Sequence, residues 1–526
     1  MLRQGRNDPR LPPRRGSSNA ARAAVIPVAV LLSLAITGCV GPNFVRPPAP
    51  NVEGFVPGRL ASPSPAKGGP PVAGQHFVTS ADVSARWWAA FRSQPLNDLI
   101  RQSVEHNPNL QSAEAAIRIA KYNALAQRGF WAPQVTGNST SSQILQTNAG
   151  AVFGGDLGAV PQPEFSLVTN QLTVSFVPDI WGANFRSVEN LDAVTEQQLF
   201  QLEAAYLALT GNVATAAIQE ASLRGQIDAT KRVIELGRDS LGILKRQFSL
   251  GQAAQADVLQ QEAQLAAFEQ LLPPLEKQLA QQRDLLTALA GQLSADEITQ
   301  KFDLAHLKLP SNLPISLPSK LVDQRPDVRA AEANMHAASA LIGVAIAARL
   351  PNVLISANGG STSYNFAQAF APGTGFYTVA AGVTAPIFDG FTLYNKQKAA
   401  EAALDQADAQ YRTTVITAFQ NVADALRALQ SDARAVKAAV HSEETAKASL
   451  DIVRKQLSEG LINQLALFNA QQVYLTAVNV RVQAEANRLS DTAALFVALG
   501  GGWPAGCVTA NWRDCAMGEA ASQPKG

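Results

Sequence analysis

The chain contains the same unit twice, and this duplication limits its fold more than any other feature of the sequence. Five pairs of landmarks recur in one order, the first two pairs 218 residues apart and the others 208 or 209 residues apart: Asn107-Pro108-Asn109-Leu110 with Arg325-Pro326-Asp327-Val328, Pro133 with Pro351, Pro178 with Pro386, Gly182 with Gly390, and Gln247-Phe248-Ser249-Leu250-Gly251 with Gln456-Leu457-Ser458-Glu459-Gly460. We therefore expect two tandem repeats, over residues 95–290 and 319–500, joined by a linker over residues 291–318.

Each repeat has the same order of predicted elements: a helix that restarts at a proline, two strands, a very long helix, and a second helix of roughly 35 residues after a turn that contains glycine. The predicted ranges are helices over about 96–131 and 319–349, strands over 134–146, 166–177, 352–364 and 376–388, and long helices over 183–248 and 392–457. At 1.5 Å per residue the long helices measure about 100 Å, which exceeds the core of a globular domain.

The shorter helices carry a seven-residue repeat. Leu265, Leu272, Leu279 and Leu286 form one row of it. Sustained heptads predict coiled-coil packing between neighbouring helices. We therefore interpret these rows as packing contacts between helices and not as a ligand site. Pro273-Pro274 interrupts the row in the first repeat and predicts a kink or a restart there.

Two of the predicted strands alternate between apolar and polar residues without any charge. The apolar faces are Val168, Asn170, Leu172, Val174 and Phe176 in the first repeat, and Tyr377, Val379, Ala381, Val383 and Ala385 in the second. A tilted strand needs about 9–11 residues to cross a membrane, and these segments are long enough. A soluble sheet with one polar face would give the same pattern. The lipid anchor inferred below, and the absence of a second apolar layer to cover the sheet, favour the membrane.

Four strands per chain cannot close a barrel. Bacterial barrels need at least about eight strands, and an open edge is not tolerated in lipid. If the strands span a membrane, the chain must form an oligomer.

The N-terminus predicts a secreted lipoprotein. Arginines precede an apolar run from Ala23 to Ile36, which is too short for a mature transmembrane helix. Ile36-Thr37-Gly38-Cys39 is similar to a bacterial lipobox, in which the cysteine is lipidated and becomes the first residue. We expect a signal peptide over residues 1–38, a lipid on Cys39 and a Pro-rich segment over residues 39–94. An ordinary signal peptide with an incidental cysteine is the alternative.

Composition excludes several other classes. The formal net charge of +1 and the lack of a basic stripe argue against nucleic-acid binding. Five scattered histidines and three cysteines predict no metal site, and phosphate loops and nucleophile elbows are absent. We expect no enzyme activity and no cofactor other than the covalent lipid. Cys507 and Cys515, in the tail over residues 501–526, either form a disulfide or stay as thiols.

Taken together, these features resemble the outer-membrane efflux factors of the TolC type, and specifically their NodT/OprM-like lipoprotein branch. The motifs that carry the resemblance are Cys39-Val40-Gly41-Pro42-Asn43-Phe44-Val45-Arg46-Pro47, Trp87-Trp88, Asp179-Ile180-Trp181-Gly182, Gln324-Arg325-Pro326-Asp327-Val328, Pro386-Ile387-Phe388-Asp389-Gly390 and Leu499-Gly500-Gly501-Gly502-Trp503. The resemblance implies a mainly α-helical chain with a membrane β-barrel portion: a homotrimer with a 12-stranded barrel in the outer membrane and an α-helical barrel in the periplasm.

The resemblance also implies a function. Such channels are passive exit ducts for small molecules, delivered by an inner-membrane pump, here expected to be of the RND type, and a periplasmic adaptor. The expected adaptor-docking tips are Gln247, Ser249, Gly251, Gln456, Ser458 and Gly460. Glycine caps at helix ends would explain the same turns without docking.

The expected periplasmic gate comprises Asp257, Leu465, Ala466 and Asn469. Asp257 matches an aspartate of the family, although an acid in the first turn of a helix also stabilises the helix dipole. Ala466 and Asn469 depart from the family, whose members place aspartates in this region. We therefore hypothesise a gate that closes mainly by packing near Leu465 and Phe468.

Two other functions compete with efflux. A channel for protein or peptide secretion would use the same architecture with a different pump. A coiled-coil lipoprotein that braces the envelope without conducting would need no strands, and the alternating segments argue against it.

Overall fold

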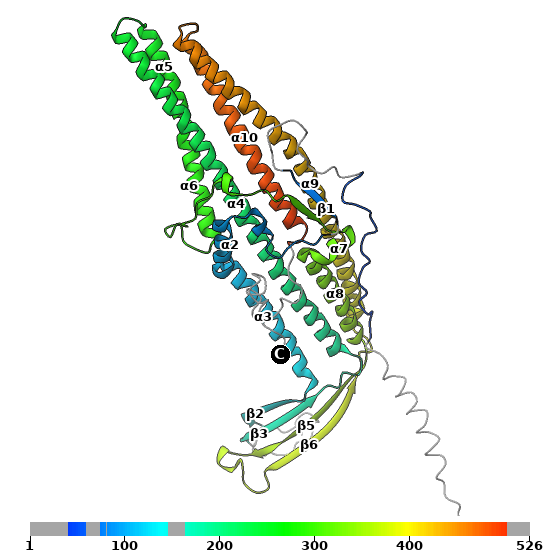
Figure 1. Ribbon diagram of the computed structural model, residues 1–526. Coiled ribbons are helices and arrows are strands. Elements are labelled where there is room, and N and C mark those ends of the chain that lie inside the picture. Colours follow the sequence, from blue (N-terminus) through cyan, green and yellow to red (C-terminus); the bar gives the residue numbers. More distant parts are fainter. Residues whose placement is uncertain (1–39, 59–73, 80, 146–163, 502–526) are drawn as a thin grey trace, which may run out of the picture. The chain divides into compact units, whose positions relative to one another are not determined.

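The computed structural model describes residues 40–58, 74–79, 81–145 and 164–501 (Figure 1). Cys39, Cys507 and Cys515 lie outside the described residues. The chain divides into two compact units. Of the described residues, unit 1 contains 40–43, 125–145, 164–190 and 339–401, and unit 2 contains the others.

Unit 1 is built on one antiparallel sheet in the order β2-β3-β5-β6. The four strands are β2 (Gln134–Leu145), β3 (Glu164–Phe176), β5 (Asn352–Ser363) and β6 (Gly375–Thr384). β6 ends four residues before the predicted end at residue 388. Pro386 follows and cannot donate a ladder hydrogen bond, so the strand stops before it.

The register of the sheet places like residues on the same face. Val135, Val174, Ala357 and Val379 lie opposite one another across the four strands. One residue further along, the row is Thr136, Thr173, Asn358 and Thr378. One face is therefore largely apolar and exposed, and the other carries uncharged polar side chains.

Short helices precede each pair of strands. They are α2 (Gln94–His106) and α3 (Pro108–Arg128) in the first repeat, and α7 (Pro318–Gln324) and α8 (Pro326–Ala347) in the second. Asn107 and Arg325 have extended backbone, as expected before proline, and this separates the two helices of each pair. Short 3₁₀ helices lie at η1 (Trp87–Phe91), η2 (Gly129–Trp131), η4 (Leu304–His306) and η5 (Phe366–Gln368).

Two helical hairpins lie side by side in unit 2 (Figure 1). The first joins α4 (Ala183–Ser249) to α5 (Gln255–Glu269) and α6 (Leu272–Leu289), and the second joins α9 (Thr392–Ser458) to α10 (Gln464–Ala498). The break between α5 and α6 lies next to Pro273-Pro274. The first residues of α4 and α9 belong to unit 1, so each long helix runs from one unit into the other.

The core of unit 2 is aromatic and aliphatic. Trp87, Trp88 and Phe91 are almost fully buried, and Trp87 packs on Phe496 with ring centroids 5.7 Å apart. A parallel two-stranded sheet of β1 (His76–Thr79) and β4 (Asn312–Ile315) lies beside this core. α8 is the one helix among the described residues that is long and apolar enough to cross a membrane, and 61% of that stretch is buried inside the molecule.

Candidate functional site

The sheet of unit 1 has the properties of a channel wall. Leu172, Tyr377 and Val379 on its apolar face are large and exposed, which suits contact with lipid. Among the described residues, β2 and β6 each pair on one side only. Because a membrane strand needs both neighbours, further copies of the chain must complete the wall.

The two hairpin ends share one backbone geometry. In the first, the N–H of Gln252 donates to the carbonyl of Gln247 at 2.8 Å, and the N–H of Gly251 donates to the carbonyl of Phe248 at 2.9 Å. Gly251 has φ +72°, and Gly460 in the second hairpin has φ +75°. This is the Schellman pattern, which needs a left-handed residue that glycine provides without strain.

The second hairpin end repeats these contacts. The N–H of Leu461 donates to the carbonyl of Gln456 at 2.9 Å, and the N–H of Gly460 donates to that of Leu457 at 3.0 Å. Ser249 and Ser458 each donate to a carbonyl three residues earlier, at 2.8 and 2.7 Å.

The predicted tip residues therefore form two matching turns. The exposed apolar side chains Leu250 and Leu461 lie at these turns as well, and sequence reasoning missed them as surface features. The glycine caps explain the shape of each turn, and the exposed side chains make the turns available to a partner.

Side-chain contacts join the two hairpins near their ends. The amide of Gln464 donates to the side-chain oxygen of Gln261 at 3.2 Å, and the rings of Phe268 and Phe468 lie 5.3 Å apart. We predicted that the gate closes by packing near Leu465 and Phe468. In the structure Leu465 is exposed, and Phe468 is the residue that packs between the hairpins.

The polar members of the predicted gate have local roles. Asp257 lies in the first turn of α5, where its carboxylate accepts from the N–H of Ala254 at 3.3 Å. The N–H of Ala466 donates to the side chain of Asn463 at 3.2 Å, which caps α10. Asn469 is exposed. Asp257 is thus the only carboxylate among the four predicted gate residues.

A single carboxylate among the predicted gate residues of each chain predicts a weak electrostatic gate. We expect micromolar divalent cations to leave the conductance of the purified channel in a planar bilayer almost unchanged. Asp257→Asn should then have little effect on the small change in conductance that the cations cause, because exposed charges are screened by solvent and salt. Block at micromolar concentrations that disappears in Asp257→Asn would contradict this prediction.

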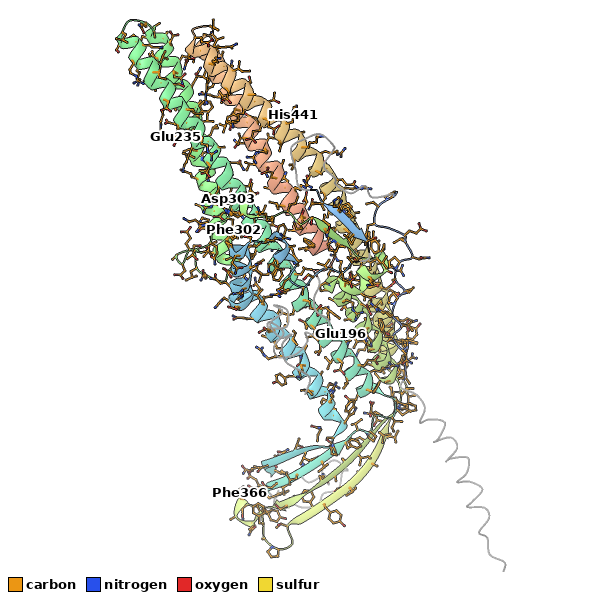
Figure 2. The ribbon with its side chains drawn as sticks, viewed as in Figure 1. Glu196, Glu235, Phe302, Asp303, Phe366 and His441 are labelled. Atoms are coloured by element: carbon orange, nitrogen blue, oxygen red, sulfur yellow. The ribbon has the colours of Figure 1, made fainter. Side chains whose placement is uncertain are left out.

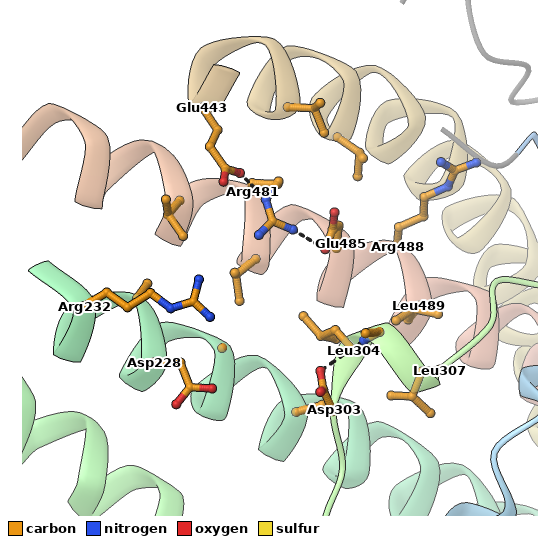
Figure 3. Close-up of a pocket in the computed structure, with 18 of the residues that line it drawn as sticks. Asp228, Arg232, Asp303, Leu304, Leu307, Glu443, Arg481, Glu485, Arg488 and Leu489 are labelled. Atoms are coloured by element: carbon orange, nitrogen blue, oxygen red, sulfur yellow. Dashed lines mark hydrogen bonds and ion pairs between the residues drawn. The ribbon is translucent and has the colours of Figure 1, made fainter. Parts of the chain in front are cut away.

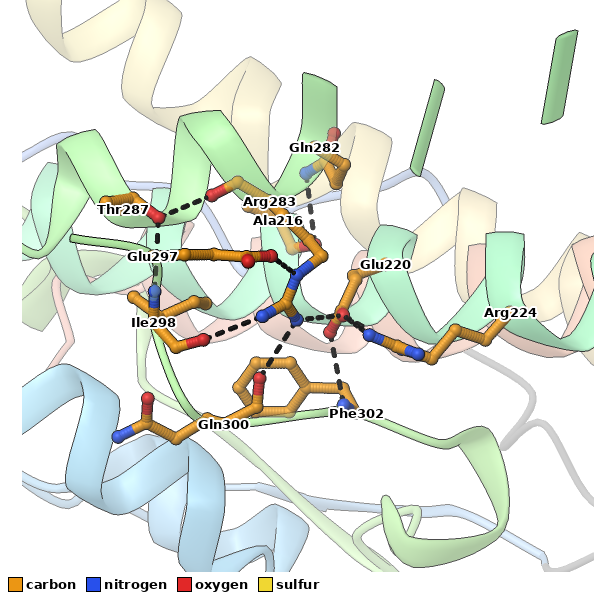
Figure 4. Close-up of polar contacts among 10 residues, drawn as sticks. All are labelled: Ala216, Glu220, Arg224, Gln282, Arg283, Thr287, Glu297, Ile298, Gln300 and Phe302. Atoms are coloured by element: carbon orange, nitrogen blue, oxygen red, sulfur yellow. Dashed lines mark hydrogen bonds and ion pairs between the residues drawn. The ribbon is translucent and has the colours of Figure 1, made fainter. Parts of the chain in front are cut away.

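Unit 2 also contains a buried ionic network that sequence analysis did not identify (Figure 4). Glu220 on α4 is fully buried and accepts hydrogen bonds from Arg283 on α6 at 2.9 Å and from Arg224 at 2.6 Å. Its second oxygen accepts from the N–H of Phe302 at 3.1 Å. Both carboxylate oxygens of Glu220 are therefore occupied.

Arg283 binds the linker between the repeats. Its guanidinium donates to the carbonyls of Ile298 at 2.7 Å and Gln300 at 3.1 Å, and it also pairs with Glu297. No local pattern could reveal this, since Glu220 lies 63 residues from Arg283 in the sequence. The network fastens the linker to α4 and α6.

A cleft of about 670 Å³ lies between α4, α9, α10 and the segment around η4 (Figure 3). Arg481 crosses it, paired with Glu443 and donating to Glu485 at 2.8 Å. Asp228 and Arg232 line the opposite wall (Figure 3). The cleft therefore presents paired charges, with Arg481 bound to Glu443 and Glu485.

Two carboxyl groups of unit 2 have raised pKa values. Burial raises the pKa of Glu203 to about 7, against the opposing charge of Arg329. Burial, followed by the hydrogen bond to Asp491, raises the pKa of Asp432 to about 7. Both carboxyls are therefore partly protonated near neutral pH, which lowers the cost of holding them between helices.

Titratable side chains such as Glu196, Glu235 and His441 lie apart along the helices (Figure 2). In the part of the chain that the structure describes, no group of three or more His, Cys, Asp or Glu residues could hold a metal ion.

The segment that follows Cys39 is built into unit 1. Buried Arg186 donates to the carbonyl of Val40 at 3.2 Å and to the side chain of Asn43 at 2.7 Å. The N–H of Val40 donates to the carbonyl of Trp181 at 3.2 Å. Gly41 has φ +98°, and a Cβ there would lie 2.5 Å from the backbone of Gly343. This segment is therefore held in place close to the point where β3 leads into α4.

Several known proteins are similar to this chain in sequence or in fold. OpmQ, an outer membrane protein for pyoverdine export from Pseudomonas putida, is 29% identical over 454 residues, which cover 85% of this chain and 95% of that protein. TtgF, the outer membrane protein of a toluene efflux pump from Pseudomonas putida, is 28% identical over 499 residues, covering 90% and 96%. The CmeC outer membrane channel of Campylobacter jejuni superposes with a TM-score of 0.78 at 20% identity, covering 88% of this chain and 95% of that one. The outer-membrane channel OprN superposes with a TM-score of 0.76 at 23% identity, covering 89% and 100%.

The two-faced sheet and the paired hairpins define a subunit of an outer-membrane channel, and this confirms the expected fold class. The profile of the family described as "Outer membrane efflux protein" matches residues 99–292 and 317–501, more than half of the chain. The chain belongs to the outer membrane efflux protein family, a family of transport proteins. The predicted location in the outer membrane is confirmed with it.

Proposed function

We propose that the chain is the exit duct of a tripartite efflux system, and that a homotrimer releases small toxic compounds delivered by a periplasmic adaptor and an RND-type pump. The observation that carries this proposal is the sheet register, which puts apolar residues on one face and uncharged polar residues on the other. A wall of this kind is stable in lipid and leaves a polar, permissive lumen. Relatives named for toluene efflux and pyoverdine export support small molecules as the cargo.

We propose that the two hairpin ends dock the adaptor. They match each other in geometry, and each turn carries an exposed leucine, Leu250 in the first and Leu461 in the second. A photo-reactive probe at Ser249 or Ser458 in living cells should capture the adaptor of a drug-efflux pump, identified by mass spectrometry. Capture of a protein-secretion adaptor, or of cell-wall components alone, would contradict the proposal.

We also propose that Cys39 is the lipid-anchored first residue after a signal peptide over residues 1–38. The contacts of Arg186 with residues 40–43 support it, because they hold the start of the mature chain in a fixed place. We propose in addition that the two repeats extend over residues 95–290 and 319–500, and that Cys507 and Cys515 form a disulfide in the tail.

Cys39→Ser should abolish incorporation of radiolabelled palmitate into the protein. Each buried methylene contributes about 0.8 kcal/mol to membrane affinity, so loss of two or three acyl chains removes a strong anchor. Cys507→Ser is the matched control and should be labelled as the wild type is. Equal labelling of Cys39→Ser would show that the anchor is elsewhere.

A further inference from the structure

A run of exposed apolar side chains continues from the last strand of the sheet into the turn before α9. On the apolar face of β6, Val379 and Val383 are 73% and 70% exposed. In the turn, Ile387 and Phe388 are 95% and 82% exposed, and the ring of Phe388 meets that of Phe391 edge-on at 6.3 Å. The surface that suits contact with lipid therefore extends past the end of the strand.

Two cations lie over one aromatic ring directly after this turn. The guanidinium of Arg349, just after α8, lies 5.7 Å from the centre of the Tyr394 ring, and the ammonium of Lys398 lies 5.9 Å from it. Arg349 also donates to Gln397, which belongs with Tyr394 and Lys398 to the first two turns of α9. Cation–π contacts of this kind hold the two positive charges close together at the surface.

The two cations differ in what neutralises them. Lys398 forms an ion pair with Glu401 at 2.7 Å. The carboxylate of Asp389, in the turn, accepts from the N–H of Leu393 at 2.8 Å and caps α9. Among the described residues, Arg349 has no carboxylate partner. Because a guanidinium has five N–H donors, Arg349 retains donors and charge for an anion.

The start of the mature chain lies against the helix that leads to Arg349. A Cβ on Gly41 would lie 2.5 Å from the backbone of Gly343 in α8. Gly343 precedes Arg349 by six positions, which is about 9 Å along a helix. The lipid proposed for Cys39 would enter the membrane two residues before Gly41. We therefore expect the end of α8 at the level of the headgroups of the inner leaflet.

The order of side chains along this surface is that of a membrane boundary. Outer-membrane barrels carry an apolar band with aromatic residues at its edges. Lipid phosphates lie just beyond this band, where lysine and arginine bind them. Here the apolar face of β6 is followed by the phenylalanine pair, and then by Tyr394 with its two cations. Arginine suits a phosphate group because its planar fork can donate two parallel hydrogen bonds.

We propose that Arg349, Tyr394 and Lys398 bind the phosphate of a phospholipid in the inner leaflet of the outer membrane. The acyl chains of that lipid lie along Ile387, Phe388 and the apolar face of β6. The bound lipid fixes the depth of the sheet in the membrane, separately from the covalent anchor. This goes beyond the proposed function, since lipid binding does not depend on what the duct carries.

Native mass spectrometry of the purified full-length trimer, with phosphatidylglycerol added to the detergent solution, tests the site. We expect Arg349→Gln/Lys398→Gln to bind this lipid at least tenfold more weakly than the wild type. Arg427→Gln/Arg434→Gln removes two exposed cations further along α9 and should bind as the wild type does. Equal binding by the wild type and the Arg349→Gln/Lys398→Gln variant would overturn the proposal.

Two further ligands show which part of the lipid is recognised. Diacylglycerol has the acyl chains without the phosphate and should bind at least tenfold more weakly than phosphatidylglycerol. Equal binding of the two would show that the patch takes acyl chains alone and would overturn the phosphate site. Glycerol phosphate has the phosphate without the chains and should not displace the lipid at equal concentration. Full displacement would assign the site to a soluble phosphate and would overturn the membrane lipid as its ligand.

A probe in living cells gives a second reading. Benzophenone at Phe391 of the full-length chain should form adducts with phospholipid, identified by mass spectrometry. Adducts with a second copy of the chain in place of lipid would show that the turn is a subunit contact and would overturn the proposal. Dye efflux is measured in the same cells: lipid adducts without efflux would reject the proposed function and leave the lipid site standing.

Discussion

Replacing Glu220 by Ala is expected to lower the free energy of unfolding by about 3–5 kcal/mol. Removing one partner of a buried ion pair leaves the other charge without compensation in a region of low dielectric constant. Here the loss would leave Arg283 without its buried partner and the N–H of Phe302 without an acceptor. Denaturant unfolding of the purified protein measures the change.

Glu297→Ala is the matched control, since Glu297 binds the same arginine but its side chain is 59% exposed. Exposed ion pairs contribute little to stability because solvent screens them, so the control should unfold almost as the wild type does. Glu220→Gln should fall between them, because it keeps an acceptor and loses the charge. Equal effects of Glu220→Ala and Glu297→Ala would show that the network does not stabilise the fold.

Linking the two hairpin ends is expected to stop efflux. The double variant Gln261→Cys/Gln464→Cys replaces two side chains that already meet between α5 and α10. In the oxidising periplasm the pair should form a disulfide and hold the ends together. If opening of the duct requires these ends to separate, substrate accumulation should rise to the level of cells without the channel and return to normal with reductant.

Lys245→Cys/Glu262→Cys is the control for the disulfide itself. These residues form an ion pair at 2.6 Å between α4 and α5, within one hairpin, so a bridge there should leave efflux unchanged. Full efflux through the oxidised Gln261/Gln464 variant, with the disulfide verified by mass spectrometry, would show that opening does not separate the hairpins at this level.

The long helices and the strands follow from local patterns in the sequence. The heptads of α10 and the alternation at Val168–Phe176 each repeat over many residues, so the periodicity is unambiguous. The restarts at Pro108 and Pro326 follow from the backbone chemistry of proline. The end of β6 was less predictable, because the alternation runs on toward Pro386 while the ladder stops at Thr384.

The hydrogen bonds and ion pairs between segments far apart in the sequence could not be predicted in the same way. Arg283 lies among the polar positions of a coiled coil, and nothing nearby distinguishes it from a solvated arginine. Arg186 binds residues more than 140 positions earlier in the sequence. Such contacts depend on the fold that brings distant segments together, so local periodicity does not predict them.

Conduction of small toxic compounds out of the cell by this chain is tested most directly by accumulation of a fluorescent apolar dye in the source bacterium. Accumulation is compared after deletion of the gene, with and without the gene restored. We predict that dye accumulates in the deletion strain and that the wild-type chain reverses this. Equal accumulation with and without the chain, with the native pump and adaptor present, would contradict the claim.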